Sequence, residues 1–547
     1  MRSADFKSFF LLCISLYFLS LSSISFAKDW RYKVKPGDNI WNITERYLSG
    51  MHYWKRLQAL NSIQDPYHIP PGTVLNIPIK WLNQAPMVAR IHALVGSVKI
   101  TDNFSAKIRP IRVGEYIFID DTLITEEDST ATVEFVDGST LLLEPNSRLK
   151  FDHVGVYPGT GMTDTRLKLE DGRIETDVAP RKGEATRFEI STPAGVTSVR
   201  GTDYRVSSES LHRESRTEVI EGKVAVTSSR RSRLVPAGFG TVSSASIAPM
   251  PPVKLLEAPQ PVAPMDVFDR LPMHLQINTL DGADRFRLQV AASTEFDRVL
   301  FDKLFQERAL RIEDLPDGDY FARIRGIDSN GLEGLHTEIV FTLNARPEAP
   351  FLVEPEADGA VVDENPLFKW AQLKSVETYY FQLAADAGFN QLLMEDRELT
   401  ENQIVSTVKL DLGQYYWRVA SQNAEEGLGP FGDIQSFRRV LPAPQTEEPE
   451  ISDSELTIRW RKGLAGQNYQ VQMDVENSFA NPFIDQVVDT PKLTITRPES
   501  GDYFVRVRTI ETDGFIGPYG EAQLISVPSE FSYWWFLSLL LLGLIAI

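Results

Sequence analysis

Histidine and cysteine, the side chains most often used for metal and nucleophilic chemistry, are few and scattered in this chain of 547 residues. No two of its 7 histidines have the His-x-His or His-x-x-x-His spacing that places two metal ligands on one strand or helix. The single cysteine, Cys13, lies in an N-terminal apolar run, so the exported chain has no disulfide, thiolate metal site or cysteine nucleophile. Gly-x-Ser-x-Gly and Gly-Lys-Ser/Thr loops are also absent from the sequence. We therefore predict a protein that is not an enzyme, with no catalytic residues, no metal site and no cofactor.

The charge balance points away from nucleic acid as a partner. Asp and Glu number 75 against 56 Lys and Arg, which gives a formal net charge of -19. Nucleic-acid binding requires a basic face. The hydrophobic fraction of 42% is that of a folded protein. At roughly 100–200 residues per domain, the length allows about three to five domains.

The N-terminus has the three-part pattern of a secretory signal peptide. Arg2 and Lys7 precede an apolar run over residues 9–24, and Ser25-Phe26-Ala27 follows with small residues at its first and third positions. We expect a signal peptide over residues 1–27 with cleavage after Ala27. An uncleaved anchor is the alternative.

The C-terminus is apolar enough for a membrane segment. Residues 531–547 carry no charge and begin with the aromatic group Tyr533, Trp534 and Trp535, which is typical of a membrane interface. About 17 apolar residues are the lower limit for crossing a bilayer. The sequence thus predicts an exported protein of the periplasm and cell envelope, held in the inner membrane by a C-terminal transmembrane helix that is either short or truncated.

Residues 30–82 have the pattern of strand, helix, helix and strand. Tyr32 and Val34 alternate as strand residues do, and Asp38 or Asn39 can cap a following helix. Apolar residues then recur at helical spacing, first at Ile40, Ile43 and Tyr47, then at Trp54, Leu57 and Leu60. A Pro-Gly turn leads into a closing strand.

This segment resembles a LysM domain. The motif residues are Tyr32-x-Val34-x-x-Gly37-Asp38-x-Ile40-Trp41-x-Ile43, Asn61, and Ile69-Pro70-Pro71-Gly72-x-x-Leu75-x-Ile77-Pro78. The resemblance implies a βααβ fold that binds N-acetylglucosamine-containing glycan, here peptidoglycan. It places the glycan-binding groove between two loops, at Gly37, Asp38, Asn39, Ile40, Tyr67, His68 and Ile69. Alternatively, Gly37 and Asp38 only make the turn and the helix cap.

Residues 88–245 are rich in short alternating strands. Strands flank Asp137-Gly138, Asp171-Gly172 and Glu221-Gly222, each of which is a hairpin turn signal. This pattern predicts a β-sandwich or a β-helical roll. The region is similar to the FecR periplasmic domain, most specifically at Thr192-Pro193 and Val199-Arg200-Gly201-Thr202. The resemblance implies an all-β fold that contacts an unknown periplasmic protein. For Arg200 we favour a structural ion pair over a functional role.

Three copies of one pattern follow a Pro-rich linker over residues 246–264. Residues 286–296, 379–389 and 469–479 align without gaps, and each copy has a later tyrosine, Tyr320, Tyr415 or Tyr503. A period near 90 residues with strands throughout predicts one β-sandwich per copy, over 265–345, 346–442 and 443–527. The copies resemble fibronectin type III modules. Trp370 and Trp460 are expected to be core residues, and the tyrosines to form tyrosine corners.

The sequence therefore predicts a multidomain, mainly β protein: a βααβ LysM module, an all-β FecR-type domain, three immunoglobulin- or fibronectin-like sandwiches and a C-terminal hydrophobic helix. The favoured function is a non-enzymatic envelope protein that binds peptidoglycan and bridges it to the inner membrane. A FecR-like signal-transduction component is the alternative. A wall-degrading enzyme is a distant third.

Overall fold

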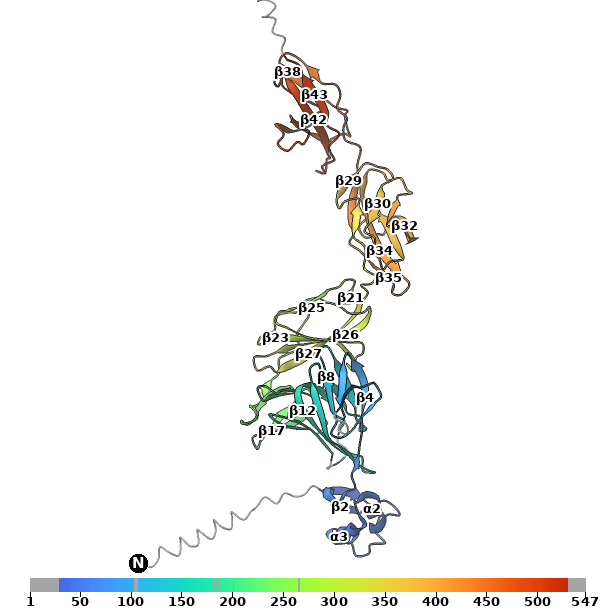
Figure 1. Cartoon of the computed structure of the whole chain (residues 1–547), viewed down its shortest axis with the longest axis vertical. Helices are drawn as coiled ribbons and strands as arrows, with labels where there is room; N and C mark the ends of the chain where they lie inside the picture. The colour runs from blue at the N-terminus through green and yellow to red at the C-terminus, as the bar shows by residue number, and fades with distance from the viewer. Residues whose placement is uncertain are drawn as a thin grey trace, which may run out of the picture. The chain divides into compact units, whose positions relative to one another are not determined.

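The computed structural model describes residues 29–102, 107–180, 183, 186–199, 201–263 and 266–529. These residues fall into two compact units that divide after Leu343 (Figure 1). The predicted signal peptide, the predicted C-terminal helix and Arg200 lie outside the described residues. Within the described part of the chain, no helix is long and apolar enough to cross a membrane. The architecture is multidomain and mainly β, as predicted.

The N-terminal module has the predicted order of elements. It consists of β1 (Asp29–Lys33), α2 (Ile40–Tyr47), α3 (Trp54–Leu60) and β2 (Val74–Pro78), and β1 and β2 pair antiparallel. Ile40, Ile43 and Leu57 are fully buried between the helices and the sheet. Leu60, expected on the same face as Leu57, is 48% exposed because α3 ends at that residue.

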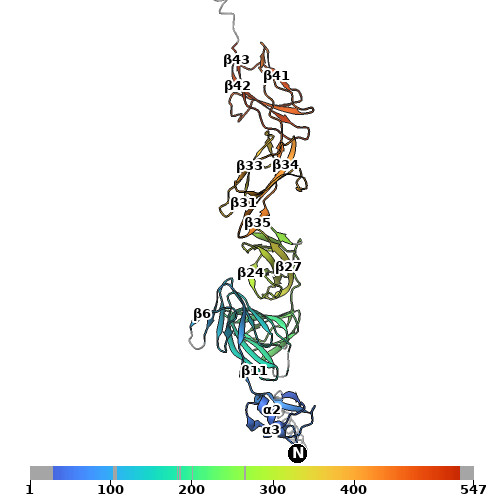
Figure 2. The ribbon, with the colours of Figure 1, turned by 90° about the vertical axis from the view of Figure 1, so that its right-hand side faces the viewer.

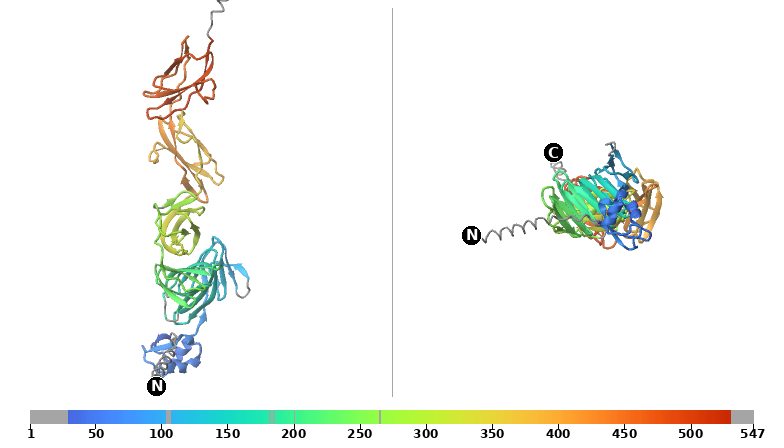
Figure 3. Two further views of the ribbon diagram at one scale, coloured as in Figure 1. Left: turned by 90° about the vertical axis from the view of Figure 1, so that its left-hand side faces the viewer. Right: turned by 90° about the horizontal axis from the view of Figure 1, so that it is seen from below.

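The next region closes into a barrel made of two sheets (Figure 1). Its strands are β3 (Ala85–Pro86), β4 (Ala89–Val95), β5 (Val98–Thr101), β6 (Ile108–Pro110), β7 (Tyr116–Ile117), β8 (Thr122–Thr125), β9 (Thr130–Glu134), β10 (Thr140–Leu143), β11 (Arg148–Tyr157), β12 (Met162–Asp177), β13 (Arg187–Thr192), β14 (Gly195–Val199), β15 (Asp203–Glu209), β16 (Glu214–Val219), β17 (Lys223–Ser228), β18 (Arg231–Pro236), β19 (Phe239–Ser244) and β20 (Val253–Lys254). The hairpin of β5 and β6 stands out from the barrel body in two views (Figures 2 and 3). A continuous apolar core, including Phe135, Phe151 and Phe188, fills the interior.

Two of the three predicted hairpins in this region have a different structure. Asp137-Gly138 does join the antiparallel pair β9 and β10. Asp171-Gly172 makes no hairpin, because β12 continues through both residues and passes from one sheet into the other. Gly172 has a φ of +95° there, and a Cβ atom would collide with Ser147. The glycine thus permits a bend within a strand rather than a chain reversal.

At Glu221-Gly222 the turn is present but the two strands do not pair with each other. β16 pairs with β15 and β19 in one sheet, whereas β17 pairs with β14 and β18 in the other. The chain therefore crosses from one sheet to the other at this turn. A dipeptide turn signal does not distinguish this crossing from a hairpin.

The first sandwich completes the N-terminal unit. Its strands are β21 (Val267–Phe268), β22 (Met273–Gln276), β23 (Arg285–Ala291), β24 (Val299–Phe305), β25 (Ala309–Ile312), β26 (Gly318–Ile327) and β27 (Glu333–Leu343). The larger sheet has the order β21-β27-β26-β23-β24, and β22 pairs with β25 in the smaller one.

The second and third sandwiches form the C-terminal unit. The second contains β28 (Leu352–Glu354), β29 (Gly359–Val361), β30 (Leu367–Trp370), β31 (Thr378–Ala384), β32 (Leu392–Leu399), β33 (Gln403–Val405), β34 (Gly413–Asn423), β35 (Gly427–Phe431) and β36 (Gln435–Arg439). The third contains β37 (Glu450–Ile451), β38 (Glu455–Arg459), β39 (Asn468–Asp474), β40 (Ile484–Val488), β41 (Lys492–Thr496), β42 (Gly501–Ile510) and β43 (Gln523–Val527).

The predicted core features of the repeats are confirmed. Trp370 is fully buried and Trp460 is 2% exposed, as expected of residues packed between two sheets. Each tyrosine corner is closed by a hydroxyl that donates to a backbone carbonyl four residues earlier, at 2.7 Å for Tyr320 and at 3.0 Å for both Tyr415 and Tyr503.

Candidate functional site

The two loops of the predicted glycan-binding groove lie side by side in the N-terminal module. The backbone N–H of Ile40, at the start of α2, donates to the carbonyl of Pro66 at 3.0 Å. This bond ties the loop before α2 to the loop before β2. The structure therefore brings the two predicted halves of the site together, although they are separated by 26 residues in the sequence.

In the first loop, Asp38 and Asn39 are occupied by local hydrogen bonds. The Asp38 carboxylate is 8% exposed and accepts from the Tyr32 hydroxyl at 2.5 Å and from the Lys35 backbone at 2.8 Å. Burial, together with the bond to Asp38, raises the pKa of Tyr32. Asn39 and Asn42 cap α2 reciprocally, with both bonds at 2.8 Å. Both predicted residues thus hold the loop in shape.

The remaining predicted residues divide into an exposed and a buried group. Tyr67 is 69% exposed, the His68 side chain is open to solvent, and Gly37, at a φ of +86°, has open space around it. Ile40 and Ile69 are buried core residues. The exposed residues are therefore the ones free to contact a glycan directly, and the assignment of all seven to the groove remains a prediction.

Asp65 fixes the orientation of the exposed second loop. Its carboxylate accepts from the Tyr67 backbone at 2.8 Å and lies 2.9 Å from Nδ1 of His68. The backbone bond from Tyr67, followed by the contact with His68, lowers the pKa of Asp65. The loop is held by a side chain that sequence reasoning did not single out, although Asp two residues before a loop N–H is a familiar Asx-turn signal.

Trp41 was not predicted as a site residue, yet it is the exposed aromatic of α2. It is 51% exposed, and its ring centroid lies 6.2 Å from that of Trp54 on α3. A large aromatic on the solvent face of a helix that otherwise presents polar groups is a signal that could have identified it.

The N-terminal module packs directly on the barrel. Tyr157 and Met162, at the turn between β11 and β12, belong to the same apolar core as Tyr32 and Tyr47. The turn approaches so closely that a Cβ atom on Gly159 would lie 3.1 Å from the Tyr47 ring. The loop before α2 is thereby connected to the barrel, because Asp38 is bonded to Tyr32 and Tyr32 packs on Tyr47. The ring centroids of the two tyrosines lie 5.2 Å apart.

The barrel and the first sandwich meet across a buried network of charges. Glu333 of the sandwich is fully buried and contacts Arg173 and Arg205 of the barrel. Within its own module it lies 2.8 Å from Arg287 and 3.1 Å from Arg325. A carboxylate so far from water is stable only when cations surround it.

Further barrel carboxylates complete the network. Glu144 accepts from Arg287 at 2.8 Å, and Glu175 accepts from Arg325 at 2.7 Å. Burial opposes the charge of Glu175, but Arg325 and Arg205 outweigh it and lower its pKa to about 2. Burial lowers the pKa of Arg205 to about 10. The sandwich is thus docked by charges that neither module could bury alone.

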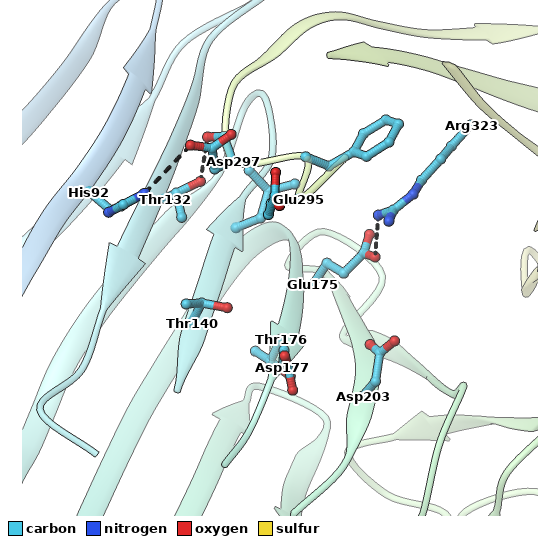
Figure 4. A pocket seen from close by; sticks show the side chains of 12 residues that line it. His92, Thr132, Thr140, Glu175, Thr176, Asp177, Asp203, Glu295, Asp297 and Arg323 are labelled. Atoms are coloured by element: carbon cyan, nitrogen blue, oxygen red, sulfur yellow. Dashed lines mark hydrogen bonds and ion pairs between the residues drawn. The ribbon is translucent and has the colours of Figure 1, made fainter. Parts of the chain in front are cut away.

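A cavity of about 440 Å³ lies beside this network, between barrel strands and the loop after β23 (Figure 4). Nε2 of His92 lies 3.5 Å from Asp297, and the Thr132 hydroxyl donates to the Asp297 carbonyl at 2.7 Å. Burial, with Glu175 nearby, raises the pKa of Asp203 in the cavity wall to about 6. The lining suits polar or cationic groups. The described residues contain no group of three or more side chains placed to hold a metal ion.

Two family models match the chain. Residues 32–78 match the LysM domain, and residues 121–225 match the FecR protein family. The chain carries a LysM domain followed by a FecR domain. This confirms the order predicted from the motifs. The FecR match begins at Asp121, whereas strands β4 to β7, which precede it, belong to the same barrel in the structure. No curated protein matches this chain.

Solved structures with similar parts have low sequence identity. A "putative anti-sigma factor" from Parabacteroides distasonis is 13% identical over 24% of this chain and 59% of its own, with a TM-score of 0.21. The FN1–FN3 domains of chicken CNTN1 are 16% identical over 50% of this chain and 99% of their own, with a TM-score of 0.19. A two-domain fibronectin type III segment of chicken tenascin is 11% identical over 33% of this chain and 100% of its own, with a TM-score of 0.21. This chain therefore spans about three fifths of the first of these structures.

Proposed function

We propose that this protein is a non-enzymatic component of the bacterial cell envelope that binds peptidoglycan through its LysM domain. One observation carries the proposal: in a segment that matches the LysM domain, the two predicted groove loops are tied together and present Gly37, Tyr67 and His68 to solvent. Backbone groups and an aromatic ring beside polar side chains are what an acetamido sugar requires. Both matched families are non-catalytic kinds of domain.

We further propose that the exported chain bridges the wall to the inner membrane, with the apolar residues 531–547 as anchor. The FecR domain then serves for contact with a protein in the periplasm. The packing of the LysM domain on the barrel, and of the barrel on the first sandwich, supports a scaffold in which these modules act as one body.

Co-sedimentation of the full chain with isolated peptidoglycan sacculi tests the glycan proposal. Because Tyr157 and Met162 of the barrel pack on the LysM domain, deletion of that domain would expose a core, so point variants are the better design. The double variant Y67A/H68A should lower the bound fraction at least tenfold. The control L60A removes a half-exposed apolar side chain from α3 and should bind like the wild type. Binding that is unaffected by Y67A/H68A, or absent from the wild type, would overturn the proposal.

The FecR match favours signal transduction as a second candidate function. In that case glycan binding must alter the barrel, and the contact between Tyr47 and the turn at Gly159 is the available route. Hydrogen exchange of residues 155–163 with and without soluble glycan fragments would measure this. If the hydrogen exchange of these residues does not change at a saturating concentration of fragment, signal transduction is excluded and the scaffold function remains.

A further inference from the structure

The three sandwiches share one sheet face, which we name the arginine face. It is formed by β23, β24 and β26 in the first sandwich, by β31, β32 and β34 in the second, and by β39, β40 and β42 in the third. Each copy has a glutamine, an acid opposite it, an arginine and a phenylalanine with positive φ at equivalent positions. In the order of the three sandwiches, the equivalent residues are the glutamines Gln289, Gln382 and Gln472; the acids Asp302, Glu395 and Asp485; the arginines Arg323, Arg418 and Arg506; and the phenylalanines Phe296, Phe389 and Phe479.

In the first sandwich the arginine face is a docking surface already in use. Gln289 and Arg325 are each 1% exposed because the barrel covers them. Arg325 donates to Glu175 of the barrel, and Gln289 donates to Glu144 at 3.3 Å. The chain thus shows which chemistry this face accepts: a neighbouring β-sheet that brings carboxylates to the two arginines of the central strand.

The third sandwich repeats the arginine pair on its central strand. Arg506 and Arg508 stand where the first sandwich has Arg323 and Arg325. Their guanidinium groups donate to the amide oxygens of Gln472 and Gln470, at 2.6–2.9 Å, and lie over the Tyr519 ring at 4.1 and 4.2 Å. Among the described residues, no carboxylate oxygen lies within 4.0 Å of either guanidinium group.

The third sandwich differs from the first at the position of the buried acid. Glu333 lies opposite Ile327 in the first sandwich, and Ile516 lies opposite Ile510 in the third. Ile516 is 50% exposed, and Val487, opposite Gln470 on the same face, is 56% exposed. The face therefore combines exposed apolar side chains with two arginines that are hydrogen-bonded to glutamines, in a chain whose net charge is -19. The carboxylate of Asp485 accepts from the same two glutamines but lies beyond ion-pair distance of the arginines.

We propose that the arginine face of the third sandwich docks a partner protein whose β-sheet presents carboxylates to Arg506 and Arg508. The charge is complementary, the apolar residues supply area to bury, and the first sandwich shows the same face in such an interface. A second copy of this chain does not fit, because its carboxylate-bearing barrel face is already covered by its own first sandwich. This surface lies outside the LysM and FecR domains, so the inference is independent of glycan binding.

The second sandwich supplies an internal contrast. It has Ala420 in place of the second arginine, and Arg418 is held between the rings of Phe389 and Phe431, each 4.0 Å away. Burial lowers the pKa of Arg418. Arg506 of the third sandwich lies in the same way between the rings of Phe479 and Tyr519, each 4.1 Å away, so the contrast rests on the second arginine alone. Because the second sandwich has no equivalent of Arg508, we do not expect it to dock an acidic partner.

Chemical footprinting with phenylglyoxal, which modifies accessible arginine side chains, tests the proposal on the full chain. Modification is compared in the purified chain, in the purified chain with sacculi, and in native envelopes of the producing cells. Arg325, with 1% of its side chain exposed, gives the level for full protection, and Arg397, with 71% exposed, gives the level for free access. We expect Arg506 and Arg508 to be modified at least fivefold less in native envelopes than in the purified chain, with Arg397 unchanged.

The variant R508A supplies the second measurement. It installs the residue that the second sandwich carries at this position, so the fold accommodates it. In native envelopes R508A should restore modification of Arg506 to the level of the purified chain. Three results would overturn the proposal: equal modification in envelopes and in the purified chain, protection by sacculi alone, or protection of Arg506 that survives R508A. A fourth result, complete protection of both arginines already in the purified chain, would also overturn it, since the face would then be closed.

Discussion

The first and third sandwiches share a fold and an arginine face but use that face differently. In the first, Glu333, Arg287 and Arg325 are enclosed with barrel residues. In the third, Arg506 and Arg508 rest on glutamines and on Tyr519 at a partly open surface. Two charged positions of the first sandwich are lost in the third, where Ile516 replaces Glu333 and Gln470 replaces Arg287. A repeat can therefore keep its core and change its role through a few charged positions on one face.

Removal of the buried acid is expected to have the largest effect. Glu333→Gln leaves the surrounding arginines without their central carboxylate, and the loss of one partner of a buried network costs about 3–5 kcal/mol. Hydrogen exchange of peptides from β23 and β26 in the full chain would measure the loss of opening free energy. The matched control is Glu338→Gln, an exposed acid that contacts Arg323 at 3.1 Å and should change exchange by less than about 1 kcal/mol. Equal effects of the two variants would show that docking does not depend on the network.

The equivalent arginines give the most direct test of the comparison. Arg325→Ala should destabilise the first sandwich by about 3 kcal/mol, because it leaves Glu175 and Glu333 with less compensation in a buried site. Arg508→Ala should cost less than about 1 kcal/mol in the third sandwich, where the partner is a neutral glutamine near the surface. A denaturant titration in which hydrogen exchange is measured for each module separately gives the loss of stability caused by each variant. A loss of similar size in both would contradict the distinction.

Asp203, a barrel residue beside the first sandwich, makes the stability of the N-terminal unit dependent on pH. Burial raises its pKa from 3.8 to about 6, so the folded state holds this proton more tightly than the unfolded chain does. Its contribution to stability is therefore greatest below about pH 4 and falls as pH rises to about 6. Asp203→Asn should stabilise the N-terminal unit by about 2 kcal/mol at pH 7 and have little effect at pH 4. Unfolding titrations of both proteins at the two pH values check this. A stabilisation of equal size at both would contradict it.

The smallest expected effect comes from a substitution that makes the third sandwich more like the first. Ile516→Glu places a carboxylate at the position of Glu333, close to the strand that carries Arg508. At a half-exposed position the new ion pair should add no more than about 1 kcal/mol to the stability of the third sandwich. It should also lower the protection of Arg506 in native envelopes, since the arginines would gain a second acid of their own module in addition to Asp485. Undiminished protection would argue against carboxylate recognition.

The sequence alone determined the modules and most of their internal features. The periodicity of Ile40, Ile43 and Tyr47 identified α2, and the three aligned copies identified the sandwiches with Trp370 and Trp460 in their cores. The sequence left Asp38 and Asn39 as candidates for the cap of α2, and the structure shows that Asn39 is the cap. These features depend on residues close together in the chain, or on a repeated pattern, and local patterning shows both. The resemblance also predicted a groove between two loops, and the bond from Ile40 to Pro66 holds these loops side by side.

Only the tertiary structure decided how those modules use their surfaces. Asp171-Gly172 has a hairpin signal, but the neighbouring Ser147 and the two sheets of the barrel make it a bend within β12. Glu333 looks like any surface acid in the sequence, and it becomes the centre of an interface because four arginines from two modules converge on it. Burial of a charge depends on which distant groups surround it, and this information resides in long-range contacts rather than in local sequence.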